Sequence, residues 1–176
     1  ALTGQRRVGK SCVMKRIYEK YSQDSHNNVI YIDMEKTAFA DITNYENLEA
    51  YVAERLDSSK DNYLFIDEVQ EIQDFEKAIL SLQSDGSCQI MVTGSNAKML
   101  SSELSTRLRG RYIGYHIHGL DYEEFIEFHN LQDNDESLGM FLQYGGLPQL
   151  RQLGLANSDL IDDYFENVVN TIVLRD

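Results

Sequence analysis

Strand-like and helix-like segments alternate from the start of the chain to about residue 120. Short runs rich in β-branched and aromatic residues indicate strands, and apolar residues that recur every three or four positions indicate amphipathic helices. The predicted strands are Asn28–Met34, Tyr63–Ile66, Gln89–Thr93 and Tyr112–Ile117, and the predicted helices between them are Tyr45–Leu56, Phe75–Leu82 and Ser101–Leu108. This succession predicts an α/β fold in which helices cover both faces of a parallel sheet.

From residue 121 onward the pattern is helical throughout. The only proline of the chain, Pro148, follows Gly145, Gly146 and Leu147, and this predicts a break between two helices. The helices expected here are Asp121–Phe128, Glu136–Tyr144, Pro148–Leu153 and Leu160–Leu174. We therefore divide the chain into an α/β core at residues 1–120 and a small helical subdomain at residues 121–176.

Composition and charge narrow the class of protein. The chain has 176 residues, enough for one α/β domain with a sizeable core, and its hydrophobic content of 42% is ordinary for a globular protein. No apolar window is long enough to cross a membrane, and we see no signal peptide. The net charge of −13 argues against direct binding of nucleic acid by this chain. Two cysteines, Cys12 and Cys88, form no disulfide framework, and we expect buried or half-buried free thiols in a reducing cytoplasm.

A phosphate-binding pattern lies almost at the first residue. The segment Gly4-Gln5-Arg6-Arg7-Val8-Gly9-Lys10-Ser11 has the spacing G-x-x-x-x-G-K-S. The two glycines let the backbone curl so that its N–H groups point at phosphate oxygens, while Lys10 supplies a compact positive charge and Ser11 a hydroxyl for Mg²⁺. The alternative is a glycine turn that matches the pattern by chance.

The residues after this loop support the first interpretation. An amphipathic helix is predicted directly behind it, from the spacing of Val13, Met14, Ile17, Tyr18 and Tyr21. The positive end of such a helix favours a bound anion. We therefore expect the loop from Gly4 to Ser11, and Cys12 behind it, to bind a nucleotide.

The strand that should lead into the loop is nearly absent. Only Ala1, Leu2 and Thr3 precede Gly4, although a phosphate-binding loop needs a buried strand before it. No glycine or proline ends the last predicted helix, which runs to the end of the chain. We expect the chain to be a fragment of a longer protein, with its first strand largely missing.

A second motif supplies two acids. In Tyr63-Leu64-Phe65-Ile66-Asp67-Glu68, four apolar residues of a buried strand precede a carboxylate pair. We expect this strand to lie next to the strand of the loop. Asp67 would then hold Mg²⁺ through water, and Glu68 would orient or deprotonate an attacking water. Solvated acids at the end of a strand are the alternative.

Three further sets of polar residues are weaker candidates. Ser95 or Asn96, just past a predicted strand, can touch the γ-phosphate or can equally cap the next helix. Asp33 and Glu35 follow another strand and are polar neighbours of the site or, as we favour, ordinary loop acids. An arginine that stabilises the transferring phosphoryl group is sought among Arg107, Arg109 and Arg111, with Arg111 first and Arg107 second, although a surface salt bridge is the commoner role for any one of them.

Four segments together resemble a known family. GQRRVGKS, LFIDEVQ, VTGSNAKMLSSELSTRLRGRY and LDYEEF look like the AAA-type ATPase domain of a large group of bacterial and archaeal proteins. In that family the core is followed by a winged-helix region and a nuclease-like domain of unknown role, and the closing segment YFENVVNTIVLRD is similar to the helix that leads out of the core. The resemblance implies a three-layer P-loop fold and roles for Lys10 and Ser11 (phosphate and Mg²⁺), Asp67 and Glu68 (the Walker B pair), Ser95 (the sensor), and Arg111 or Arg107 (the arginine finger).

From these observations we expect an ATPase that hydrolyses ATP with Mg²⁺ and couples hydrolysis to a conformational change in a downstream domain or partner. An arginine finger supplied by a neighbour would imply a homo-oligomer or a partner protein. The alternative is a nucleotide-gated switch with little turnover, associated with DNA through further domains. A small-molecule kinase is disfavoured, because an Asp–Glu pair behind an apolar strand suits activation of water.

Overall fold

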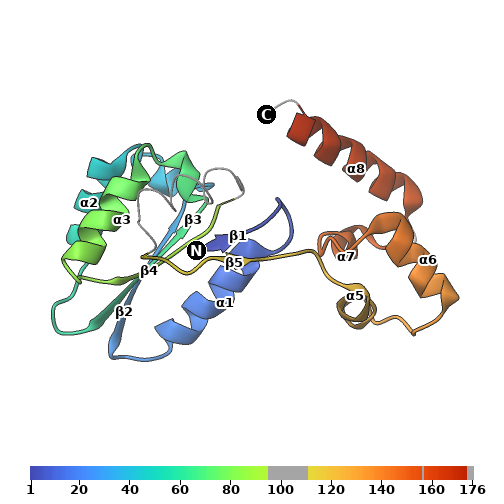
Figure 1. The fold of residues 1–176 in the computed structure, drawn as a ribbon, viewed down its shortest axis with the longest axis horizontal. Helices are drawn as coiled ribbons and strands as arrows, with labels where there is room; N and C mark the ends of the chain where they lie inside the picture. Colours follow the sequence, from blue (N-terminus) through green and yellow to red (C-terminus); the bar gives the residue numbers. More distant parts are fainter. Residues whose placement is uncertain (95–110, 156, 174–176) are drawn as a thin grey trace. The chain divides into compact units, whose positions relative to one another are not determined.

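The computed structural model of the chain describes residues 1–94, 111–155 and 157–173 (Figure 1). Two compact units can be distinguished, Ala1–Ile117 and His118–Asp176, and each is described by itself. No helix in the described part of the chain is both long and apolar enough to cross a membrane.

The first unit is built on parallel strands. Three of them form a sheet in the order β2-β3-β4, and β1 pairs with β5 in a second parallel ladder. A parallel bridge from Leu2 to Thr93 joins the two, so that the strands follow one another in the order β2, β3, β4, β1, β5. This confirms the predicted parallel α/β fold. The strands are β1 (Leu2–Thr3), β2 (Asn27–Asp33), β3 (Asp61–Asp67), β4 (Gln89–Val92) and β5 (Tyr115–His116).

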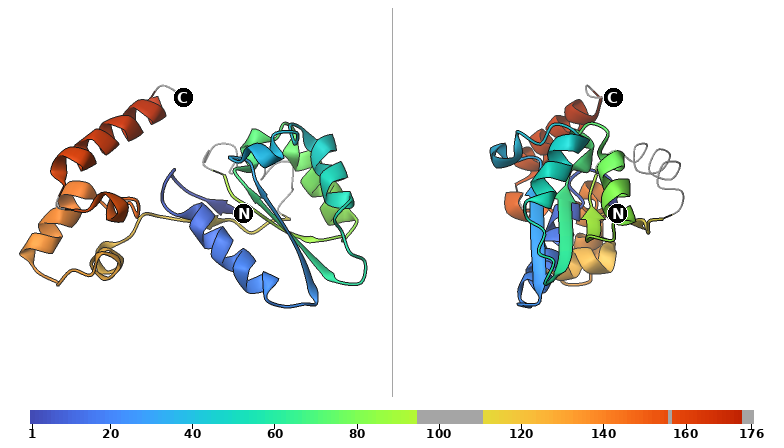
Figure 2. Two further views of the ribbon diagram at one scale, coloured as in Figure 1. Left: turned by 180° about the vertical axis from the view of Figure 1, so that it is seen from behind. Right: turned by 90° about the vertical axis from the view of Figure 1, so that its left-hand side faces the viewer.

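Helices cover the sheet on both sides. In Figure 2, α1 (Lys10–Ser22) lies on one side of the strands, and α2 (Tyr45–Ala53) and α3 (Phe75–Ser84) lie on the other. The alternation of side chains along β3 explains this arrangement, because neighbouring residues of a strand point to opposite faces. Phe65 packs in one cluster with Met14 of α1, whereas Leu64 and Ile66 belong to a second cluster that includes side chains of α2 and α3.

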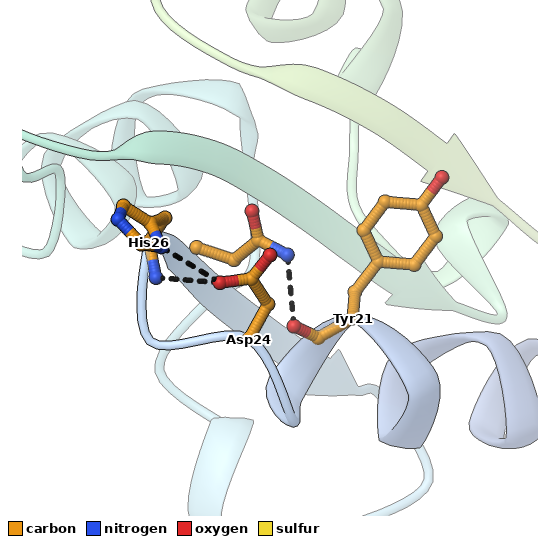
Figure 3. Close-up of polar contacts among 4 residues, drawn as sticks. Tyr21, Asp24 and His26 are labelled. Atoms are coloured by element: carbon orange, nitrogen blue, oxygen red, sulfur yellow. Dashed lines mark hydrogen bonds and ion pairs between the residues drawn. The ribbon is translucent and has the colours of Figure 1, made fainter.

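The turn between α1 and β2 is fixed by side chains that bond the backbone (Figure 3). The Asp24 carboxylate accepts hydrogen bonds from the His26 amide at 2.9 Å and from His26 Nδ1 at 3.1 Å, while Asn27 Nδ2 donates to the Tyr21 carbonyl at 2.9 Å. The two bonds from His26, the one from its backbone amide most of all, lower the pKa of Asp24. The turn connects the end of α1 at Ser22 to the start of β2 at Asn27.

Strand β5 is shorter than the sequence indicates. The predicted strand covers Tyr112–Ile117, but only Tyr115 and His116 form a ladder. Its partner strand β1 is only two residues long, so that only two residues of β5 can pair with it. Backbone bonds from Tyr115 N to Ala1 O and from Ile117 N to Thr3 O, at 2.8 and 2.7 Å, complete the contact. The predicted helix Ser101–Leu108 lies outside the described residues.

The second unit is helical, as predicted for this part of the chain. Its first helix begins with a capping box, in which Asp121 and Glu124 each accept a hydrogen bond from the other's backbone amide. Asn134 caps the next helix by accepting from Ser137 N. The helices are α5 (Tyr122–His129), α6 (Asp135–Tyr144), α7 (Leu150–Leu153) and α8 (Ser158–Val173), and two short 3₁₀ turns of the first unit are η1 (Thr37–Phe39) and η2 (Val69–Glu71).

Two backbone segments of the helical unit cross at very short range. Leu120 N donates to Gly146 O at 2.7 Å, directly behind the end of α6. A Cβ atom on Gly146 would lie 1.9 Å from the Leu120 carbonyl oxygen, which is far inside van der Waals contact. The glycine at this position is therefore required by the approach of the two backbones.

We predict that Gly146→Ala destabilises the helical unit, because the backbones must separate to admit the methyl group. The expected loss is about 1–3 kcal/mol in the free energy of unfolding. Gly139→Ala is the matched control, since Gly139 lies on α6 with nothing within 4 Å of an added Cβ, and it should stabilise the helix by about 0.5–1 kcal/mol. Urea denaturation followed by circular dichroism measures both. Equal stability of the two variants would contradict the prediction.

His129 lies in surroundings that disfavour its charged form. Its ring packs against Phe125 at 4.5 Å and Phe128 at 5.4 Å between centroids. Nε2 is buried without a hydrogen-bond partner among the described residues. Burial, and secondarily the positive charge of Arg151, lowers the pKa of His129 below its ordinary value of 6.5.

We predict that the unit loses stability as the pH falls below about 6.5, because the unfolded chain then binds a proton that the folded chain resists. Thermal unfolding of the wild type and of His129→Phe between pH 5 and pH 8 measures this. The wild type should lose more stability than the variant on acidification. Parallel curves for the two proteins would show that His129 does not carry the effect.

Candidate functional site

The loop from Gly4 to Ser11 connects β1 to α1 in an unusual backbone conformation. Gly4, Arg7 and Gly9 have positive φ angles of 140°, 68° and 101°. A side chain at Gly4 is excluded twice, because a Cβ there would also lie 2.2 Å from the carbonyl oxygen of Ile117. Gly9 forms the N-cap of α1, so that the loop leads directly into the positive end of this helix.

Lys10 is the first residue of α1, and its side chain folds back into the loop. It is 4% exposed, and Nζ donates hydrogen bonds to the carbonyls of Gly4 at 3.1 Å and Gln5 at 2.7 Å. Burial lowers the pKa of the Lys10 ammonium, while the charges of Glu68 and Asp67 act in the opposite direction. The ammonium group therefore lies within the field of both acids.

Asp67 ends β3 and joins the loop to the sheet. Its buried carboxylate oxygen Oδ1 accepts hydrogen bonds from Ser11 Oγ at 3.1 Å and from Thr93 Oγ1. The expectation that β3 lies next to the strand of the loop is wrong, because β4 lies between β3 and β1. The contact still forms, because Ser11 stands in the first turn of α1, the helix that packs over this face of the sheet.

Thr93 is a site residue that sequence reasoning missed. It is completely buried, its hydroxyl accepts a hydrogen bond from Glu68 N at 3.0 Å, and it donates to Asp67. The signal is the strand register: Ile66 pairs with Val92, so the next residue of each chain segment brings Asp67 opposite Thr93. A single sequence does not contain this register.

Further acids gather at the same edge of the sheet. Asp33 ends β2 opposite Asp67 and pairs with Lys36 at 2.9 Å. Burial and the charges of Glu68, Asp33 and Asp67 raise the pKa of Glu35. Both acids therefore lie within the field of Asp67 and Glu68, and a role for either of them in the site stays a prediction. Burial and the same two aspartates also raise the pKa of Tyr31.

The arrangement suits a phosphorylated ligand with a divalent cation. Loop amides and an ammonium group can neutralise phosphate oxygens. Ser11 and Asp67 supply a hydroxyl and a carboxylate at 3.1 Å from each other, which are hard oxygen ligands of the kind that Mg²⁺ prefers. Within residues 1–94, 111–155 and 157–173, no three His, Cys, Asp or Glu side chains form a metal cluster. A cation here would thus keep water and phosphate oxygens as its remaining ligands.

Most of the other predicted residues that the structure describes are exposed. Of the remaining loop residues, Val8 is buried, and Gln5, Arg6 and Arg7 are exposed. The prediction of a buried or half-buried thiol is wrong for Cys12, which is exposed in the first turn of α1, and is confirmed for Cys88, which is half-buried. Arg111 is exposed ahead of β5. Ser95, Asn96, Arg107 and Arg109 lie outside the described residues.

Comparison with known proteins shows which family the chain resembles. Residues 1–126 match the family model described as AAA domain. Uncharacterized proteins of Haemophilus influenzae and Methanocaldococcus jannaschii are 29% and 28% identical over 99% and 94% of this chain. The chain spans 45% and 39% of the length of these two relatives.

Two solved structures share the fold. Cdc6p from Pyrobaculum aerophilum superimposes with a TM-score of 0.60 at 13% identity, covering 85% of this chain and 52% of that protein. Hsp104 of Saccharomyces cerevisiae, in complex with casein, gives a TM-score of 0.53 at 16% identity, covering 99% of this chain and 34% of that one. At these identities the likeness concerns the fold alone.

Proposed function

This chain belongs to the AAA domain family, and we propose that it binds ATP together with Mg²⁺ and hydrolyses it to ADP and phosphate. One observation carries the proposal. The Ser11 hydroxyl and the Asp67 carboxylate, which come from the phosphate-binding loop and from the end of β3, are in direct contact at 3.1 Å. The two motifs therefore serve one ligand.

Each residue has a role that follows from its place. The curled loop Gly4–Ser11 directs amides at the phosphates, and Lys10 exchanges its carbonyl partners for phosphate oxygens as ATP enters. Ser11 and Asp67 hold Mg²⁺, directly or through water, and the cation neutralises charge on the β- and γ-phosphates when bound. Glu68, the next residue after Asp67, accepts a proton from the attacking water. We assign Ser95 to sensing of the γ-phosphate.

Hydrolysis is proposed to drive a conformational change in a downstream domain or partner. Arg111, exposed on the described surface, is the first candidate for an arginine finger that acts on a neighbouring copy or a partner protein, and Arg107 is the second. Such a device would make turnover depend on assembly. A cytoplasmic location stays a prediction that rests on the free thiols of Cys12 and Cys88.

We predict that Glu68→Gln loses turnover and keeps ATP affinity, because the amide retains the shape of the side chain but cannot accept the proton. Phosphate release should fall by about 10²–10⁴-fold, with an unchanged dissociation constant for ATP. Glu71→Gln is the matched control, since Glu71 is an exposed acid on η2 and should keep the wild-type rate.

These two measurements also separate the candidate functions. A wild type that binds ATP but releases phosphate as slowly as Glu68→Gln would indicate the nucleotide-gated switch. Phosphate transferred to a small acceptor, with no free phosphate, would indicate a kinase. Absence of saturable ATP binding by the full-length protein would refute both the ATPase and the switch.

Mixing two inactive variants tests the arginine finger. We predict that Arg111→Ala lowers turnover by about 10³-fold or more and keeps ATP affinity. If Arg111 acts on a neighbour, mixing Arg111→Ala with Glu68→Gln should restore phosphate release, since a site with an intact Glu68 then meets an intact arginine from the other variant. A mixture as inactive as its components would argue against action between copies of this chain.

A further inference from the structure

The backbone of Glu68 adopts a conformation that a glutamate rarely takes. Its φ and ψ angles are 55° and 52°, in the left-handed region, directly after the last residue of β3. Such a conformation is unfavourable for a residue other than glycine and persists only where the surroundings over-determine it. The contacts of Glu68 should therefore include groups that hold it in place.

The first such group is the hydroxyl of Thr93. The hydroxyl oxygen accepts a hydrogen bond from the Glu68 amide at 3.0 Å, and the hydroxyl donates its only proton in a hydrogen bond to Asp67 Oδ1. Thr93 is itself fixed, because its amide donates to Ile66 O at 2.9 Å and its carbonyl accepts from Val69 N at 3.0 Å. The residues on either side of the acid pair, Ile66 and Val69, are thus bonded to the backbone of Thr93, whose side chain is completely buried.

The second group is the amide of Gln70. Its Nε2 atom donates a hydrogen bond to Oε2 of the Glu68 carboxylate. Gln70 stands on η2, whose first residue, Val69, bonds the Thr93 carbonyl. Thr93 therefore bonds the backbone of Glu68, Gln70 bonds its carboxylate, and Val69 links the two through its bond to Thr93.

We propose that Thr93 and Gln70 are positioning residues that orient Glu68 for activation of the hydrolytic water. Thr93 fixes the backbone of Glu68, and Gln70 fixes the carboxylate by occupying Oε2, so that Oε1 is the oxygen that accepts the water's proton. The inference rests on the proposed ATPase function. Orientation of this kind acts on the chemical step more than on the binding of ATP, because neither residue belongs to the phosphate-binding loop. Loss of the Thr93 hydroxyl also removes a bond to Asp67, the proposed cation ligand, so that Gln70 is the residue whose replacement tests the positioning of Glu68 alone.

Replacement of Thr93 tests the backbone arm. Thr93→Val keeps the shape but removes both hydrogen bonds of the hydroxyl, and Thr93→Ser keeps both. We expect Thr93→Val to lower kcat about 10–100-fold, as loss of a supporting contact does, with KM for ATP little changed, and Thr93→Ser to recover most of the wild-type kcat. Equal loss in the valine and serine variants would show that packing and not the hydroxyl matters, which would overturn the proposal for Thr93.

Replacement of Gln70 tests the carboxylate arm and does not involve the buried core. Gln70→Leu should lower kcat by a similar factor at unchanged KM and melting temperature, whereas Gln73→Leu, at an exposed glutamine nearby, should have the wild-type kcat. In a Glu68→Gln background, Gln70→Leu should cause no further loss, because the group that it orients has been replaced. The same loss in both backgrounds, or a rise in kcat in the single variant, would overturn the proposal.

The proposed function and the positioning role of Thr93 and Gln70 can be refuted separately. A wild-type protein that binds no ATP or releases no phosphate would refute the proposed function. A wild type that hydrolyses ATP, with Gln70→Leu and Thr93→Val at the wild-type kcat, would refute only the positioning role.

Discussion

The site depends on one carboxylate that two hydroxyl groups share. Asp67 Oδ1 accepts from Ser11 at the start of α1 and from Thr93 at the end of β4, and these residues are 56 and 26 positions away from it along the chain. Through Ser11 it attaches the phosphate-binding loop to the sheet, and through Thr93 it attaches the segment that holds Glu68. Without this junction the loop and the acids would be separate features of the same fold. The packing of α1 against Phe65 of β3 places the hydroxyl of Ser11 where the junction can form.

The same junction concentrates unfavourable features that a ligand would relieve. A buried ammonium group, a left-handed glutamate and several carboxylates lie together at the edge where β2 and β3 end. Burial, and after it the like charges of Glu68, Asp33 and Asp67, raise the pKa of Glu35. A divalent cation would offset the carboxylate repulsion, and phosphate oxygens would give the ammonium group of Lys10 a charged partner in place of two carbonyls. Local cost of this kind is common at sites whose geometry serves a reaction.

The local patterns of the sequence were sufficient for the fold and for the central pair of motifs. The apolar run Leu64–Ile66 predicts a buried strand that places Asp67 at the edge of the sheet, and β3 is such a strand. The role of Thr93 was not predictable, because it follows from strand register, which depends on packing across the sheet. The position of β4 between β3 and β1 depends on the same packing, and it is why the expectation that β3 lies next to the strand of the loop is wrong. Gln70 could be seen in the motif LFIDEVQ, but its contact with Glu68 depends on a left-handed backbone that the residue type disfavours.

Ser11 and Asp67 meet at 3.1 Å, where we propose that a cation and a triphosphate bind together. Titration of the full-length protein with ATP, with and without Mg²⁺, in the wild type and in Asp67→Asn measures this joint binding. We expect saturable binding that Mg²⁺ strengthens in the wild type and strengthens much less in the variant. Absence of ATP binding, or an Mg²⁺ effect of the same size in both proteins, would refute a joint site.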